Sequence, residues 1–111
     1  MSAQKKQVRK TFRAAVFERD GYTCRACGFE SSPERADAEL DAHHITNRNE
    51  MPNGGYVPEN GISLCALCHL KAETHHRGES VPHGFAPEEL YELIGSSEET
   101  ARAAALDESE A

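Results

Sequence analysis

Four cysteines and a histidine doublet between them are the residues of this chain best suited to chemistry. The cysteines form two Cys-x-x-Cys pairs separated by 37 residues: Cys24 and Cys27, then Cys65 and Cys68. The doublet is His43-His44, and the second cysteine pair runs directly into His69. Thiolates and imidazoles are zinc ligands, and imidazoles also titrate near neutral pH. The spacing therefore indicates two interleaved sites, one of thiolates and one of imidazoles.

The thiolate set predicts a structural metal. Two Cys-x-x-Cys turns can aim four sulfurs at one ion, which completes a tetrahedral zinc shell with Zn–S bonds of about 2.3 Å. A closed shell leaves no open position, so we expect Zn²⁺ to be structural here. Two disulfides or a redox dithiol are the alternatives. The N-terminal MSAQKKQVRK lacks the apolar stretch of a signal peptide, which favours a cytoplasmic, reducing location and therefore metal binding.

Composition limits the chain to one small domain with an uneven charge. Only 38% of its 111 residues are apolar and none is Trp, so a staple such as a metal is expected. No apolar run approaches the length of a membrane span. Residues 1–25 carry seven basic and two acidic groups, whereas residues 79–111 carry nine acidic groups and one basic group. This suits a phosphate-binding core with a solvating extension, although two solvated faces would give the same pattern.

Local patterns predict the elements that position these residues. A basic amphipathic helix is predicted over about residues 6–19, because apolar side chains recur at helical spacing: Val8, Phe12, Ala15 and Val16. A strand is predicted over residues 39–45 and a helix over about residues 66–75. The stretch from 47 to 60 is rich in Gly, Asn and Pro and must be mostly loop. The apolar pattern resumes after it, at Ile62, Leu64 and Leu67. Strand, loop and helix thus bring the doublet within reach of His69.

The end of the chain has a different character. A helix is predicted near residues 87–94, and Ser96 with Glu99 suggests a capping box for a final helix with little apolar face. That helix is expected to be marginal. We therefore divide the chain into residues 1–78, which hold all four cysteines and five of the six histidines, and residues 79–111, an acidic extension that is helical or partly disordered.

The order of these motifs resembles the HNH endonuclease family, whose catalytic fold is the ββα-metal motif. DAHHIT, NGGYVPENGISLC and ALCHLKAE carry the resemblance, which covers about residues 11–76. It implies the α+β class: a small zinc-stabilised ββα-metal domain with an N-terminal helix and a helical, acidic C-terminal extension. Residues 1–78 would then be the nuclease domain.

The resemblance also implies a role for each residue of the imidazole site. His43 corresponds to a ligand of a catalytic divalent ion, and His44 to the general base that takes a proton from the attacking water. Asn60 corresponds to the residue that holds the base and the loop in position, and His69 to the ligand from the helix. Some family members have a further ligand one turn later, usually His. This chain has Glu73 there, an acceptable oxygen ligand whose role is left open.

Further groups complete the expected site. Mixed nitrogen and oxygen ligation admits Mg²⁺, Mn²⁺, Ni²⁺ or Zn²⁺ as the catalytic ion. Phosphates dominate nucleic-acid affinity, and the basic residues expected to contact them are Arg13, Arg19, Arg25, Arg48 and Lys71. Ordinary surface charge is the alternative reading of each, and Arg48 is expected nearest the scissile phosphate. The other histidines, His75, His76 and His83, are interpreted as ordinary surface or core residues.

These expectations predict a metal-dependent endonuclease that hydrolyses DNA phosphodiester bonds. RNA stays open as a substrate, no membrane partner is expected, and a homodimer would offer two active sites for two strands. The alternative is a zinc-stabilised module that binds nucleic acid or protein without catalysis. That module would hold one structural zinc and no second metal. A thiol enzyme, the third reading, would need a reactive cysteine of lowered pKa.

Overall fold

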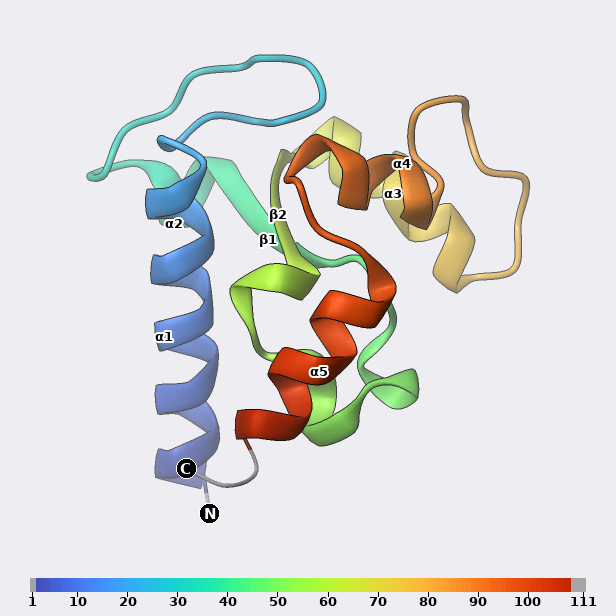
Figure 1. Ribbon diagram of the computed structural model, residues 1–111. Coiled ribbons are helices and arrows are strands. Elements are labelled where there is room, and N and C mark those ends of the chain that lie inside the picture. The colour runs from blue at the N-terminus through green and yellow to red at the C-terminus, as the bar shows by residue number, and fades with distance from the viewer. Residues whose placement is uncertain (1, 109–111) are drawn as a thin grey trace.

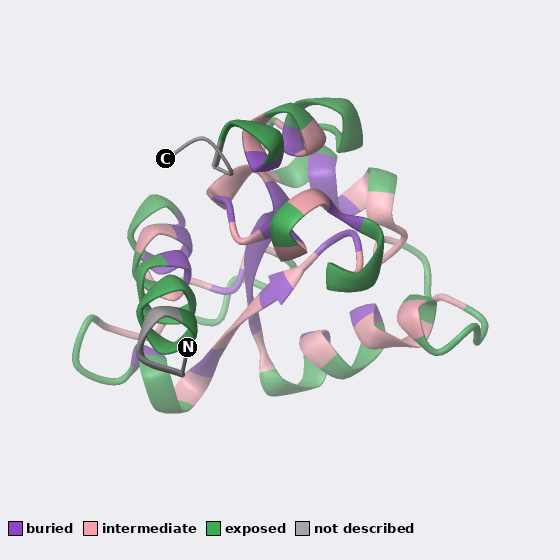
Figure 2. Cartoon of the chain, turned by 90° about the horizontal axis from the view of Figure 1, so that it is seen from below, coloured by how far each residue is buried: buried purple, intermediate pink, exposed green. Residues whose placement is uncertain are grey.

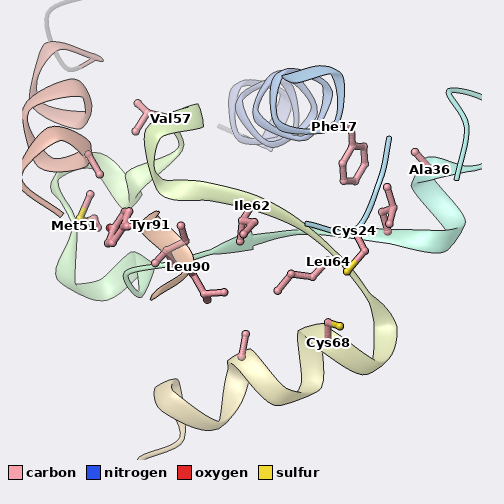
Figure 3. Packing of buried hydrophobic residues seen from close by; sticks show 14 of the residues in the cluster. Phe17, Cys24, Ala36, Met51, Val57, Ile62, Leu64, Cys68, Leu90 and Tyr91 are labelled. Atoms are coloured by element: carbon pink, nitrogen blue, oxygen red, sulfur yellow. The ribbon is translucent and has the colours of Figure 1, made fainter. Parts of the chain in front are cut away.

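A two-stranded antiparallel sheet of β1 (Leu40–His44) and β2 (Gly61–Cys65) lies between two helices in the computed structural model, which describes residues 2–108 (Figure 1). α1 (Ser2–Arg19) covers one face of the sheet and α3 (Ala66–His76) lies against the other (Figure 3). This arrangement confirms the predicted α+β class. No helix in the described part of the chain combines the length and hydropathy that a membrane crossing needs.

Further elements connect and cover this core. They are α2 (Ala36–Glu39), the 3₁₀ turns η1 (Arg48–Glu50), η2 (Pro52–Gly55) and η3 (Pro58–Asn60), and the helices α4 (Pro87–Leu93) and α5 (Glu98–Glu108). The three 3₁₀ turns occupy the stretch predicted to be loop. The buried residues lie in the strands, on the inward faces of the helices and in the segments that connect them (Figure 2).

The strand register sends the two residues of the histidine doublet to opposite faces of the sheet. His43 pairs with Ile62 and His44 pairs with Gly61, and directly paired residues share a face. His43 therefore points with Ile62 toward α3, whereas His44 points with Gly61 toward α1. α1 packs closely here, because a Cβ on Gly61 would lie 2.5 Å from Cγ2 of Val16. One strand thus serves two different environments.

The predicted N-terminal helix is present and begins earlier, at Ser2. Phe12, Val16 and Phe17 are buried against the sheet, whereas Val8, expected on the apolar face, is 45% exposed. The reason is that the first turns of α1 extend past the end of the sheet (Figure 1). Side chains there line a surface instead of a core.

Only some of the apolar residues that follow the loop of residues 47–60 lie in the core. Ile62 and Leu64 alternate along β2 and are fully buried, but Leu67 is 71% exposed. The helical period starts at Ala66, so Cys68 and Ala72 turn inward and Leu67 faces out. Leu67 continues the apolar pattern in the sequence but lies outside the core.

Both C-terminal helices contribute to the same core. Leu90 and Tyr91 of α4 and Ala101 and Ala105 of α5 are all at most 3% exposed, and α5 packs against η2 and η3. A helix with little apolar face docks here because two alanines allow a close approach. The sequence predicted a marginal helix here, and the structure contains α5 packed in the core.

The predicted capping box is one residue out of register. Ser97 Oγ, not Ser96 Oγ, accepts a hydrogen bond from the Thr100 backbone N–H at 3.1 Å. Ser96 Oγ instead donates to the Glu59 carbonyl at 2.9 Å. The two adjacent serines therefore have different roles: Ser97 caps α5, and Ser96 attaches the start of α5 to η3.

A buried carboxylate fastens the end of α1. The Asp20 side chain is fully buried and accepts hydrogen bonds from Arg19 at 2.8 and 2.9 Å, from Arg25 at 2.8 Å and from the Ser63 backbone N–H at 2.9 Å. Burial raises the pKa of Asp20, but Arg19 and Ser63 outweigh burial and hold the pKa below its ordinary 3.8. Asp20 thus joins α1, the cysteine loop and β2.

We expect Asp20→Asn to lower the free energy of unfolding by about 2–3 kcal/mol, because two part-buried arginines lose a charged partner. The stabilisation is present above pH 3.8 and lost as the pH falls through the lower folded pKa. The difference should therefore stay constant from pH 8 down to the pH at which thiolate protonation releases zinc. Denaturant unfolding measures it, with Asp37→Asn as the control, since Asp37 is 90% exposed beside Arg13. Equal effects of the two substitutions would contradict the assignment.

Candidate metal centre and active site

The four cysteines gather where the loop after α1 meets the junction of β2 and α3. Their sulfurs all lie within 4.8 Å of one another, and Cys27 Sγ lies 3.7 Å from Cys65 Sγ. Sulfurs of a tetrahedral site with Zn–S bonds of about 2.3 Å are separated by about 3.8 Å. All four cysteines are free of disulfides. Figure 3 shows Cys24 and Cys68 with their sulfurs turned toward each other. The donor set and its spacing therefore fit a zinc ion.

The thiols also have the electrostatics of a site that needs a cation. Burial raises the pKa of Cys24, but backbone N–H donors of Cys27, Cys65 and Ala26 outweigh it and lower the pKa to about 7. Burial and the neighbouring thiols raise the pKa of Cys68. The Cys24 thiolate therefore forms readily, whereas the Cys68 thiol resists ionisation. The charge of a divalent ion would favour the ionised form of both.

A second group of ligand atoms lies on the α3 side of the sheet. One atom each from His43, His69 and Glu73 lie within 4.8 Å of one another. Glu73 Oε2 is 3.2 Å from His43 Nδ1 and 3.3 Å from His69 Nε2. His43 comes from β1, and the other two are one turn apart on α3. The departure from the family pattern at Glu73 thus falls within the ligand group.

The group has the features expected of a metal site. His43 is 2% exposed, and its Nδ1 has no hydrogen-bond partner among the described residues although Glu73 is close. The two atoms approach without hydrogen-bond alignment, as ligands of a common ion do. Burial, followed by His69 and His76, lowers the pKa of His43 to about 2, so the ring is neutral and can ligate.

Two residues that sequence reasoning missed support this group. Asp41 Oδ2 lies 3.4 Å from His69 Nδ1, which leaves Nε2 of that ring to face Glu73. His76 stacks on His43 with ring centroids 5.2 Å apart, and its Nε2 lies 2.9 Å from the His44 carbonyl oxygen. His76, read from the sequence as an ordinary surface or core residue, is part-buried and makes both of these contacts. Its signal was helical spacing, seven residues after His69 on the same face.

His44 lies on the other face of the sheet, between aromatic rings. It stacks on Phe12 at 4.6 Å between centroids and meets the edge of Tyr56 at 4.8 Å. Burial, followed by Arg48 and His76, lowers the pKa of His44 to about 4. The buried Nε2 has no hydrogen-bond partner in the described part of the chain. The ring is therefore neutral at pH 7 and has a nitrogen free to accept a proton.

Asn60 fixes the backbone that follows the doublet. Its Oδ1 accepts from the Thr46 N–H at 2.9 Å and from the Tyr91 hydroxyl at 2.7 Å, and its Nδ2 donates to the carbonyls of Thr46 and Gly55. Asn60 is completely buried. None of these bonds reaches the His44 ring, so Asn60 holds the loop that follows the doublet.

This cysteine and histidine pattern agrees with a family comparison. Residues 24–76 match the family model described as HNH endonuclease. The chain contains an HNH domain. No curated protein and no solved structure matches the chain. The match includes both ligand groups, His44 and Asn60, and it ends at the last residue of α3.

The basic residues predicted to bind phosphate lie in several different places around the HNH domain. Arg19 and Arg25 bind the buried Asp20, and Arg13 contacts α2 and the Phe17 ring. Their guanidinium groups are thus engaged in the fold. Lys71 lies over the Phe85 ring, on the exposed side of α3. Arg48 alone of the five lines the groove that contains the doublet, His69 and Glu73.

The Tyr91 hydroxyl makes buried hydrogen bonds with the HNH domain from outside the matched range. The Tyr91 hydroxyl lies 2.7 Å from both Asn60 Oδ1 and Thr46 Oγ1. We expect Tyr91→Phe to reduce the free energy of unfolding by about 1–3 kcal/mol, because a buried polar pair loses its partner. Denaturant unfolding of the zinc-loaded protein measures this. Tyr22→Phe is the control, since the Tyr22 hydroxyl bonds to none of the described residues. Equal stability of both variants would exclude a role for the Tyr91 hydroxyl.

Proposed function

We propose that this protein is a metal-dependent endonuclease that hydrolyses DNA phosphodiester bonds with His44 as the general base. The observation that carries the proposal is the neutral, unpartnered His44 beside a three-ligand group in one groove of about 280 Å³. A neutral imidazole can take a proton from water at pH 7. We also propose that residues 1–78 form the nuclease domain and that residues 79–111 are an acidic extension of it.

The α3 side of the site is suited to hold a divalent ion. His43, His69 and Glu73 supply two nitrogens and one oxygen, a set that Mg²⁺, Mn²⁺, Ni²⁺ or Zn²⁺ can use. Such an ion supplies charge neutralisation at the phosphate and the departing oxygen. Asp41 orients the His69 ring, and His76 packs against His43. These contacts keep both imidazoles aimed at the groove.

The remaining roles follow from position. Arg48 lowers the pKa of His44 through its charge and lines the same groove, so it is suited to bind a phosphate oxygen. Asn60 holds the chain at Thr46, two residues after His44. It is therefore a positioning residue in this proposal. Phe12 and Tyr56 keep the His44 ring in one orientation.

A plasmid assay with a metal series tests the proposal. Zinc-loaded protein should convert supercoiled plasmid to nicked circles with at least one of Mg²⁺, Mn²⁺, Ni²⁺ or added Zn²⁺, and His69→Ala should not. Calorimetry should show a second bound ion in the wild type that His69→Ala loses. His75→Ala is the control, because His75 is exposed on the same helix and outside the ligand group.

The alternative function gives a different outcome. A binding module without catalysis would retain DNA in a gel-shift experiment yet leave the plasmid intact under every metal. Equal nicking by wild type and His69→Ala would likewise contradict the proposed metal site.

A further inference from the structure

A second groove adjoins the active-site groove on the α1 side. It has a volume of about 450 Å³ and lies between the first turns of α1 and the η1–η2 segment. Its main lining residues are Lys5, Val8 and Arg9 from the helix and Arg48, Asn49 and Tyr56 from the segment. This is where α1 extends past the sheet, so the groove has solvent access.

The groove is cationic in a chain of net charge −7. Lys5, Arg9 and Arg48 line it, and no carboxylate does. None of the three forms an ion pair with the described residues, in contrast to Arg19 and Arg25 on Asp20. Lys5 and Arg9 are four residues apart on α1, with Cβ atoms about 5–6 Å from each other. The groove therefore presents a row of available positive charges.

The positively charged groove adjoins His44, the proposed general base, through Arg48. Arg48 lines both grooves and donates from Nη1 to the Tyr56 hydroxyl at 2.8 Å. Burial raises the pKa of Tyr56, but Arg48 and Arg9 beside its hydroxyl outweigh burial and lower it. The Tyr56 ring in turn meets His44 edge-on at 4.8 Å. A ligand in the second groove would thus continue directly to His44.

The apolar part of the groove, here called its floor, consists of Val8 and the Tyr56 ring. Val8 is 45% exposed there, and the Tyr56 ring lies over Gly54. A Cβ on Gly54 would lie 2.8 Å from Tyr56 Cε2, and Gly54 has φ +80°, so only glycine admits the ring in this position. Positive charges together with an apolar and aromatic floor match a nucleotide, which has a phosphate and an unsaturated ring.

We propose that this groove binds the strand being cut, next to the scissile phosphate, with Lys5 and Arg9 on its phosphates and with Val8 and Tyr56 against a sugar or base. The inference rests on the proposed function and assigns the path of the substrate. One strand fits a groove of this volume, so single-stranded or locally opened DNA should bind with its bases against the floor. The path runs from His44 along α1 toward its N-terminus.

Binding of a labelled single-stranded oligonucleotide to the cleavage-inactive His44→Ala protein tests the proposal. Fluorescence anisotropy should show that the double variant Lys5→Gln/Arg9→Gln binds about tenfold more weakly or worse. Its affinity should also depend less on salt, since each lost phosphate contact on a single strand reduces the log–log slope by about 0.7. The matched control is Lys6→Gln/Lys10→Gln, which removes equal charge from the same helix outside the groove. That pair should bind close to the parent.

Two further results separate the possible failures. Val8→Ser should weaken binding severalfold without changing the salt slope, and unchanged affinity would overturn the apolar contact. Equal losses in the two double variants would show diffuse attraction and overturn the groove. If wild type nicks plasmid while those variants bind alike, the groove fails and the proposed function stands. If wild type nicks under no metal, both fail.

Discussion

His44→Ala is expected to slow DNA cleavage by about 10²–10⁴-fold, the usual contribution of a positioned general base. The ring is neutral at pH 7 because burial, Arg48 and His76 lower its pKa to about 4. The neighbouring imidazole of His43 points to the opposite side of the sheet. Single-turnover nicking at saturating metal measures the chemical step separately from binding.

A loss of activity must be separated from a loss of fold, because His44 is packed between Phe12 and Tyr56. His44→Gln keeps a polar side chain of similar volume but cannot accept the proton, so it should be as inactive as His44→Ala. Zinc content and the unfolding midpoint should match those of wild type. His83→Gln, at a 99% exposed side chain, is the control. Nicking by His44→Gln at the wild-type rate would show that another group is the base.

Removal of the structural zinc is expected to unfold the whole chain. Zinc coordination by four thiolates contributes about 10 kcal/mol or more to folding, whereas a domain has a total stability of about 5–15 kcal/mol. The cysteines join the loop after α1 to the start of α3, and Cys24 and Cys68 are themselves part of the buried cluster. Cys68→Ser should therefore lose cooperative melting, as should wild type treated with a strong chelator.

Circular dichroism with metal add-back makes this result decisive. The helical signal should disappear on chelation and return when Zn²⁺ is restored to the wild type, but not in Cys68→Ser. The double variant Lys6→Gln/Lys10→Gln, far from the cysteines, should respond as wild type does. A chelated protein that still melts cooperatively would show that the apolar core alone maintains the fold.

Local spacing predicted the parts of the structure that depend on neighbouring residues. The Cys-x-x-Cys turns, the helix over residues 6–19 and the helix that begins at Ala66 follow from short-range patterns, and the structure contains each. The motif order was enough to predict an HNH domain, which the family match confirms. The grouping of His43 with His69 needed only one strand, one turn of helix and the resemblance.

The rest depended on contacts between distant segments. Arg19 and Arg25 look like free basic residues until Ser63 and Asp20 come together, 43 positions apart. Tyr91 reaches Asn60 from a helix with no motif that points to the site. Adjacent serines cannot be told apart as helix caps without knowing that Glu59 lies beside one of them. His76, in contrast, was accessible from helical spacing alone.

The different roles proposed for His43 and His44 follow from the alternation of side chains along β1, not from any chemical difference between the two imidazoles. Inserting or deleting one residue in the strand would exchange the faces to which they point, whereas a change of two residues would restore them. The pairing of Leu40 with Cys65 holds one end of the hairpin next to the thiolates. A zinc ion there would fix the register of the strand. It would thereby determine which of the two imidazole rings faces the metal ligands and which faces the water that is to be activated.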